Sequence, residues 1–154
     1  MLPEFKEFLS IFNAKSVRYL VVGGYAVSLH AQPRSTQDID LFIASDPRNA
    51  GQVFAALQEF GAPLVGLKPE DFAQRGKFFR MGRAPLAVDI LPEIDGVYFE
   101  EAWSNRLEVL IDPATETKAF FISIDDLISN KLASGRPQDL ADVAALRQAT
   151  KDHL

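Results

Sequence analysis

Residues 34–43 read Arg-Ser-Thr-Gln-Asp-Ile-Asp-Leu-Phe-Ile, and this stretch carries the strongest prediction of the fold. Its second half is short and rich in Ile and Leu, which predicts a strand over 38–43. Every second side chain of a strand points to the same face, so we expect Asp38 and Asp40 on one face. Apolar strands seldom carry carboxylates unless the charge has a partner, because burying an unpaired charge is very costly. The pair therefore predicts a site at which cations neutralise carboxylates.

A third carboxylate stands in the same kind of context. Residues 86–91 read Leu-Ala-Val-Asp-Ile-Leu, which predicts another strand, with Asp89 inside it. If that strand lies beside 38–43 with Asp89 on the same face, three carboxylates converge, and hard oxygen ligands suit Mg²⁺. The pattern favours metal-dependent phosphoryl or nucleotidyl transfer, with Asp38, Asp40 and Asp89 as catalytic residues and metal ligands. The alternative is a structural ion pair between Asp89 and an arginine.

A glycine pair precedes these carboxylates in the chain. Gly23-Gly24 follows a predicted strand over 18–22 and opens a predicted helix over 25–30. Glycines at that position let a phosphate approach the backbone, and the amides of a helix N-terminus favour anions. The alternative is a tight strand-to-helix turn. Neither a GxxxxGK[ST] loop nor a GxGxxG fingerprint is present.

The remaining pattern mixes helices with strands. Apolar spacing predicts helices over 4–12, 47–60, 98–103, 124–133 and 138–148, and strands over 77–81, 107–111 and 118–122. Asp46 and Ser123 are suitable N-caps, and Gly61 is a stop signal. The segment 64–76 gives no clear prediction. We therefore expect an α+β, or mixed α/β, fold in a single domain over 1–154, with a core of about 15–122 and closing helices over 124–149.

The bulk properties narrow the function classes. The chain has 154 residues, a net charge of −5 and no cysteine, which removes disulfides, thiolate zinc sites and cysteine nucleophiles. No apolar stretch approaches the roughly 20 residues that span a bilayer, and the N-terminus lacks a signal-peptide layout, so we expect a cytoplasmic protein. The negative charge argues against a generic nucleic-acid binder. A local basic stretch is either a solvated face or a landing surface for a polyanion: Lys68, Arg75, Lys77, Arg80 and Arg83.

The order of these motifs resembles a known superfamily. Gly23-Gly24, then Arg34-x-Thr36-x-Asp38-Ile-Asp40-Leu, then Asp89, is similar to the nucleotidyltransferases that share their core with polymerase beta. Gly-Gly in place of the more common Gly-Ser most resembles the AbiEii-type branch of toxin–antitoxin and phage-defence proteins and their short relatives. The resemblance implies a mixed sheet with the carboxylates on one face. It also implies Mg²⁺ or Mn²⁺ as cofactor and transfer of a nucleoside monophosphate from a nucleoside triphosphate.

The resemblance also implies nucleotide-binding residues outside the aspartates, namely Gly23, Gly24, Arg34, Thr36 and Lys131. Residues 131–142 are similar to a segment of those relatives in which the lysine approaches the triphosphate. Arg34 either contacts phosphate or braces the loop, and Thr36 either binds or caps the turn. On a helix, Asp139 would fall on the apolar face and would need a cation, supplied by Arg34, Lys131 or Arg136.

The chain is short for an enzyme of this kind. Only the segment after Asp89 is left to hold an acceptor, so either the acceptor is simple or a partner protein or second protomer completes the site. The acceptor is RNA, a protein hydroxyl or a small molecule. The alternative is an inert, antitoxin-like member that binds a nucleotide or a partner without turnover. The intact aspartate triad favours the enzyme, and the small acceptor platform favours the inert protein.

Overall fold

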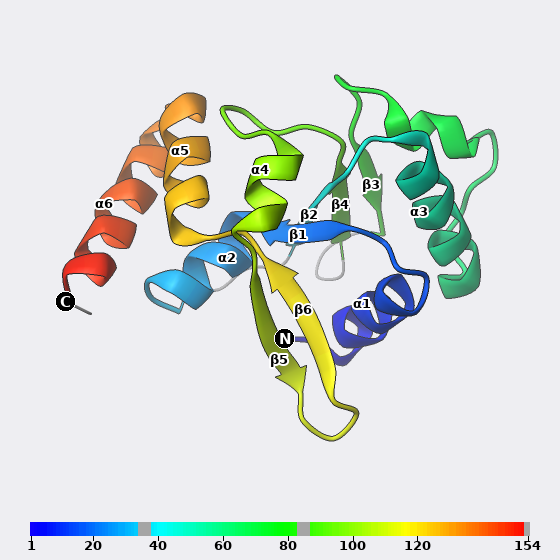
Figure 1. The fold of residues 1–154 in the computed structure, drawn as a ribbon, viewed down its shortest axis with the longest axis horizontal. Helices are drawn as coiled ribbons and strands as arrows, with labels where there is room; N and C mark the ends of the chain where they lie inside the picture. Colours follow the sequence, from blue (N-terminus) through cyan, green and yellow to red (C-terminus); the bar gives the residue numbers. More distant parts are fainter. Residues whose placement is uncertain (34–37, 83–86, 153–154) are drawn as a thin grey trace.

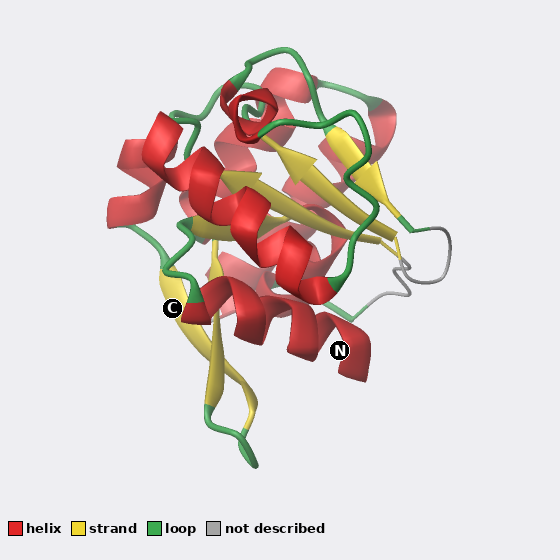
Figure 2. Ribbon diagram, turned by 90° about the vertical axis from the view of Figure 1, so that its right-hand side faces the viewer, coloured by secondary structure: helices red, strands yellow, loops and turns green. Residues whose placement is uncertain are grey.

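The computed structural model describes residues 1–33, 38–82 and 87–152, and it has the mixed α/β architecture expected from the sequence. Six strands form one mixed sheet in the order β3-β4-β2-β1-β6-β5. Helices lie on both sides of the strands (Figure 2). The elements in chain order are α1 (Pro3–Ala14), β1 (Tyr19–Val22), α2 (Gly23–His30), β2 (Asp38–Ile43), α3 (Pro47–Phe60), the 3₁₀ turn η1 (Pro69–Ala73), β3 (Phe79–Met81), β4 (Ala87–Leu91), α4 (Phe99–Ser104), β5 (Leu107–Asp112), β6 (Thr117–Phe121), α5 (Ile124–Ser134) and α6 (Pro137–Asp152).

Helix ends follow local sequence signals. The Asp46 side chain accepts a hydrogen bond from the Asn49 backbone N–H and caps α3, and Gly61 ends that helix in the left-handed conformation. The Ser123 side chain accepts from the Asp126 N–H and caps α5. Both caps and the α3 bounds confirm the sequence prediction. Helix α2 begins at Gly23, two residues earlier than the apolar pattern indicated.

One face of the central strands packs into the hydrophobic core. Ile39, Leu41 and Ile43 alternate along β2 and are fully buried. Helix α1 adds four buried side chains to the same core, namely Phe5, Phe8, Leu9 and Phe12. Burial of these large apolar groups is the main stabilising contribution to the fold.

The opposite face of β2 carries Asp38, Asp40 and Phe42, because successive side chains alternate between faces. Strand β2 runs parallel to β4 with Asp40 opposite Asp89, and antiparallel to β1 with Asp40 opposite Val22. This register places the aspartate pair beside the point where β1 ends and α2 begins.

The chain ends in two helices that lie at the opposite end of the molecule from α3 (Figure 1). Helices α5 and α6 pack against each other, and α6 also contacts α2. The β5–β6 hairpin extends beyond the body of the molecule in both ribbon views (Figures 1 and 2). Within the described residues, no helix has the length and apolar character needed to cross a membrane.

Candidate active site

The three predicted aspartates come from two neighbouring strands, and two of them share one arginine. Arg80 on β3 lies opposite Asp89 in the antiparallel β3–β4 pair. Its Nη2 atom donates to Asp89 Oδ2 at 2.9 Å and to Asp38 Oδ2 at 3.1 Å. The Asp38 side chain is 35% exposed, whereas that of Asp89 is 11% exposed. The arginine partner considered for Asp89 in the sequence analysis is therefore Arg80.

Asp40 lies in the most unfavourable electrostatic position of the three. Burial raises its pKa to about 7, and the charge of Asp89, a hydrogen bond to Asp89 and the charge of Asp38 act in the same direction. Lys131 opposes the shift. Two carboxylates this close favour sharing one proton over both being ionised near neutral pH.

The residues at this point fit a divalent cation. Asp89 Oδ1 is buried and has no hydrogen-bond partner among the described residues. The donors are carboxylate oxygens, the ligands that Mg²⁺ and Mn²⁺ prefer. Within the described chain, however, no three or more His, Asp or Glu side chains already form a metal cage. Arg80 neutralises part of the charge of Asp38 and Asp89. The raised pKa of Asp40 means that this carboxyl group holds a proton more readily than usual.

Gly23 is required where β1 turns into α2. Its φ is +66°, in the left-handed region that favours glycine. A Cβ at this position would overlap the Asp40 carboxylate. The close approach of backbone to carboxylate explains why the first glycine stands here. Gly24 is the second residue of α2.

Lys131 is held in a buried ionic cluster. Its Nζ lies 3.3 Å from Asp139 Oδ1 and 3.1 Å from Asp142 Oδ2. Asp139 also accepts from Arg136 Nε at 2.7 Å, and the Arg136 bonds keep the pKa of Asp139 below its usual range. The expectation that Asp139 needs a cation is met by both Lys131 and Arg136. The cluster fixes Lys131 within electrostatic reach of Asp40.

A polar cavity of about 250 Å³ lies at this site, and residues from both the N-terminal and the C-terminal parts of the chain line it. Gly23, Asp40 and Lys131 all line it, which brings together three predicted site residues from β1–α2, β2 and α5. Further polar lining comes from the segment after β4, from α5, from the α5–α6 turn and from the start of α6: Glu93, Asp95, Asn130, Ser134, Arg136 and Asp139. The amide, hydroxyl and cationic donors around this space suit a phosphate chain. Because Asp40, Glu93, Asp95 and Asp139 also line it, a phosphate chain would have to bind together with a divalent cation.

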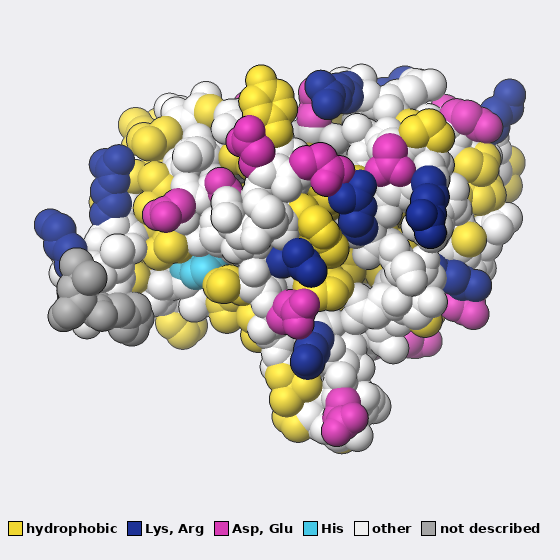
Figure 3. Space-filling view, in the orientation of Figure 1, with side chains coloured by type: hydrophobic (Ala, Val, Ile, Leu, Met, Phe, Trp, Pro, Cys, Tyr) yellow, Lys and Arg dark blue, Asp and Glu magenta, His cyan; other side chains and the backbone are white. Residues whose placement is uncertain are grey.

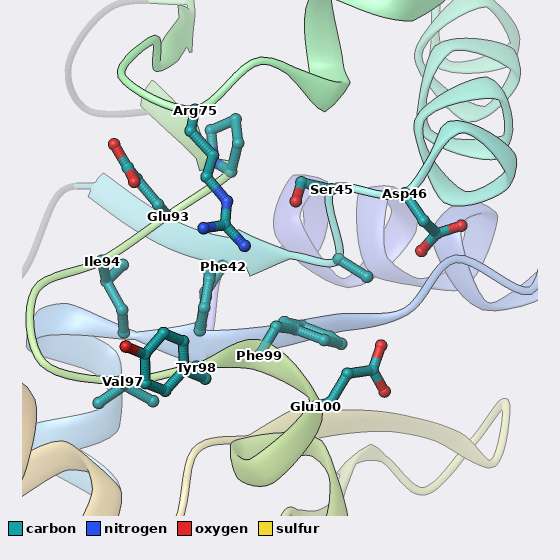
Figure 4. Close-up of a pocket in the computed structure, with 12 residues that line it drawn as sticks. Phe42, Ser45, Asp46, Arg75, Glu93, Ile94, Val97, Tyr98, Phe99 and Glu100 are labelled. Carbon is teal, nitrogen blue, oxygen red and sulfur yellow. The ribbon is translucent and has the colours of Figure 1, made fainter.

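A second cavity, of about 450 Å³, adjoins the first, and Glu93 and Ile94 line both. Its floor includes Phe42 and Phe99, whose ring centroids lie 5.1 Å apart in an edge-to-face contact. In Figure 4 the Arg75 side chain extends into this cavity above Phe42. Figure 3 shows apolar side chains exposed between α4 and α3, with acidic and basic side chains around them.

Most of the predicted site residues lie close to one another in the structure, and two lie outside the described part of the chain. Asp38, Asp40, Asp89, Gly23 and Lys131 lie around the cavity or its carboxylates. Arg34 and Thr36 belong to 34–37, which are not described.

Sequence reasoning assigned Arg80 only to a basic stretch. The register of the β3–β4 pair, with Arg80 opposite Asp89 and Met81 opposite Val88, places it at the site, and no sequence pattern predicts that register. Glu93 lies in an irregular segment with no periodicity, so no sequence pattern indicates that it lines both cavities.

Comparison with known proteins identifies relatives of this chain. Residues 3–150 match the model of the family described as "Nucleotidyltransferase of unknown function (DUF6036)". No curated protein matches the sequence.

Several solved structures share the fold at low sequence identity. The lincosamide antibiotic adenylyltransferase LnuA, solved with lincomycin bound, is 19% identical with a TM-score of 0.61, and the match covers 97% of this chain and 98% of that one. ANT(2'')-Ia, in complex with adenylyl-2''-tobramycin, is 17% identical with a TM-score of 0.59 and coverages of 97% and 87%. A nucleotidyltransferase-like protein from Paracoccidioides brasiliensis is 17% identical, with a TM-score of 0.54 and coverages of 94% and 72%.

Proposed function

Because the chain belongs to this nucleotidyltransferase family, we propose that it transfers a nucleoside monophosphate from a nucleoside triphosphate to an acceptor hydroxyl. One observation carries the proposal. One polar cavity beside Asp89 is lined by Gly23, Asp40 and Lys131. The first and last of these residues are more than 100 positions apart in the sequence. That cavity offers a close backbone approach, a carboxylate for metal and a cation for phosphate.

In this proposal the residues divide the work by their chemistry. Asp38, Asp40 and Asp89 would hold Mg²⁺ or Mn²⁺, which when bound neutralises the carboxylates and lowers the pKa of an attacking hydroxyl. Gly23 lets the Asp40 carboxylate lie against the backbone at the cavity wall, and Lys131 and Arg136 would offset the negative charge of a phosphate there. Arg34 and Thr36 remain proposed phosphate contacts by resemblance, and Gly24 contributes to the amides at the start of α2.

The bonds in the proposed step balance without a further reactant. The acceptor oxygen forms a bond to the α-phosphorus while the bond from that phosphorus to the bridging oxygen breaks. Pyrophosphate leaves with the electron pair of the broken bond. Asp89 takes the proton of the acceptor hydroxyl, directly or through a water.

A small molecule is the acceptor class best supported. One structural neighbour is a lincosamide antibiotic adenylyltransferase with lincomycin bound, and another is in complex with adenylyl-2''-tobramycin. Each match covers 97% of this chain. The net charge of −5 and the carboxylates around the second cavity, from Asp46, Glu93 and Glu100, disfavour a polyanion such as RNA there.

One observation favours the inert alternative, a nucleotide- or partner-binding protein of the antitoxin type. Lys131 is paired with two carboxylates and Arg80 bridges two others, so the charged groups of the site already satisfy one another. This pairing satisfies the two cations but not every carboxylate, since Asp40 has a raised pKa and Asp89 Oδ1 lacks a partner among the described residues. An inert protein of this kind would bind a triphosphate without transferring it.

Transfer is tested with α-labelled nucleoside triphosphates, Mn²⁺ or Mg²⁺, and separate pools of hydroxylated small molecules, RNA and protein. We expect label to appear in a small-molecule pool, and Asp89→Asn to abolish the label without loss of fold. Asp125→Asn, on the exposed start of α5, is the matched control and should transfer normally. Binding of triphosphate with no label in any pool would support the inert alternative, and transfer by Asp89→Asn would refute the mechanism.

A further inference from the structure

The second cavity adjoins the reacting groups on the same face of the sheet. Phe42 in its floor follows Asp40 by two residues in β2, so the two side chains point the same way about 7 Å apart along the strand. The cavity shares Glu93 and Ile94 with the polar cavity that contains Lys131. A nucleotide whose phosphates occupy the polar cavity therefore has its nucleoside within reach of this space.

The lining suits a flat ring and not a phosphate. Phe42 and Phe99 provide an aromatic floor, and Phe99 is fixed by stacking on Trp103 at a centroid distance of 5.7 Å. The charged groups that line the cavity are three carboxylates and the guanidinium of Arg75. Aromatic side chains bind rings of this kind through apolar contact and stacking.

Two charged groups of the lining have no partner among the described residues, namely Arg75 and Glu93. Arg18 forms ion pairs with Asp46 and Glu100, with nitrogen–oxygen distances of 3.1 Å and 2.8 Å. Arg75 and Glu93 form no ion pair or side-chain hydrogen bond with any described residue, and both line the same cavity. In Figure 4 their side chains lie at one end of the cavity, and the carboxylates of Asp46 and Glu100 lie at the other.

We propose that this cavity is the nucleobase pocket of the nucleotide donor, and that Arg75 and Glu93 select guanine. An arginine fork donates to the two adjacent acceptors O6 and N7 of guanine. A carboxylate accepts from the two adjacent donors of guanine, its N1–H and its 2-amino group. Adenine offers an amino donor beside N7, so an arginine fork meets only one acceptor there. The pair therefore favours GTP over ATP as donor.

The inference rests on the proposed function, and base binding is separable from phosphate binding. Tripolyphosphate with Mn²⁺ probes the polar cavity alone, because it has no base. The α,β-methylene analogues of GTP and ATP probe both cavities without transfer. Titration calorimetry of the whole chain with each probe gives the affinities.

We expect the GTP analogue to bind at least about tenfold more tightly than the ATP analogue. Glu93→Gln, which keeps the shape but replaces an acceptor with donors, should remove most of that preference. Arg75→Lys, which keeps the charge but loses the fork, should do the same. Tripolyphosphate should bind the wild type and Arg75→Lys alike, because Arg75 does not line the polar cavity. Glu59→Gln, on the exposed end of α3, is the control and should keep the preference.

Two results would overturn the inference while leaving nucleotidyl transfer standing. One is tight tripolyphosphate binding with equal affinity for the two nucleotide analogues. The other is a GTP preference that survives both Glu93→Gln and Arg75→Lys. Absence of binding by tripolyphosphate and by both analogues would instead refute the proposed function itself.

Discussion

At the scale of single residues, the site places three carboxylates close together, and a neighbouring arginine neutralises part of their charge. Asp38 and Asp89 share Arg80, and Asp40 faces Asp89 across the β2–β4 pair with no cation among the described residues in hydrogen-bond contact. The raised pKa of Asp40 is the consequence. A divalent cation beside Asp40 would offset the repulsion between the carboxylates that raises this pKa.

Asp40 predicts a dependence of stability on pH. Its pKa is about 7 in the folded protein and 3.8 as the ordinary value, so the folded state holds a proton that the unfolded state releases. Stability contributed by protonated Asp40 is therefore lost as pH rises from about 4 through about 7. The stability of Asp40→Asn relative to the wild type should therefore rise between pH 5 and pH 8, by on the order of 2–3 kcal/mol. Thermal unfolding in metal-free buffer measures this, and an equal difference at both pH values would contradict it.

Arg80 predicts a competition with metal. Because its guanidinium occupies oxygens of Asp38 and Asp89, a divalent cation that binds both carboxylates must displace it. Arg80→Gln should therefore bind Mn²⁺ alone several-fold more tightly than the wild type, as measured by the signal of free Mn²⁺ in electron paramagnetic resonance. Arg147→Gln, on the exposed side of α6, removes the same charge far from the site and should bind as the wild type does. Weaker Mn²⁺ binding by Arg80→Gln would show that the arginine organises the ligands instead of competing with the cation.

At the scale of elements, local signals predicted what local interactions determine. The bounds of α3 follow from Asp46, Pro47 and Gly61, and the cap of α5 follows from Ser123, because each signal acts within one helical turn. Strand parity likewise predicted the shared face of Asp38 and Asp40. The start of α2 was missed because glycine is a poor helix former, and contact with a distant strand sets its conformation.

What the sequence could not predict depends on contacts between distant segments. The double role of Arg80 follows from the β3–β4 register, and the position of Glu93 follows from an irregular loop. The ionic cluster around Lys131 was foreseen only in part, since helix geometry indicated that Asp139 needs a cation but not that Asp142 would join it. Residues 34–37 lie outside the described chain, so Arg34 and Thr36 remain predictions.

The β1–α2 junction predicts a contrast between two glycines. Gly23→Ala adds a Cβ that overlaps the Asp40 carboxylate, at a positive φ that costs about 1–2 kcal/mol for other residues. Gly51→Ala, inside α3, meets nothing within 4 Å and should stabilise the protein by about 0.5–1 kcal/mol. Denaturant unfolding measures both. If Gly23→Ala is as stable as the wild type and binds tripolyphosphate equally well, the close approach to Asp40 has no part in the site.

At the scale of the whole molecule, the site is assembled from both ends of the chain. The polar cavity takes residues from β1, α2 and β2 on one side, and from α5 and the α5–α6 turn on the other. Helix α6 in turn contacts α2, so the closing helices are part of the same packed unit as the carboxylate strands. A ligand in this cavity therefore joins segments that are separated by more than 100 residues in sequence.

This arrangement predicts where a ligand changes the dynamics of the protein. Binding to the folded state suppresses local opening of every segment that forms the site. Tripolyphosphate with Mn²⁺ should slow amide hydrogen exchange in α5 and the start of α6 as well as in β2 and β4. The β5–β6 turn at 113–116 contributes nothing to either cavity and serves as the internal control. Exchange that slows only in β2 and β4 would mean that the phosphate chain does not reach Lys131, and that the C-terminal helices serve packing alone.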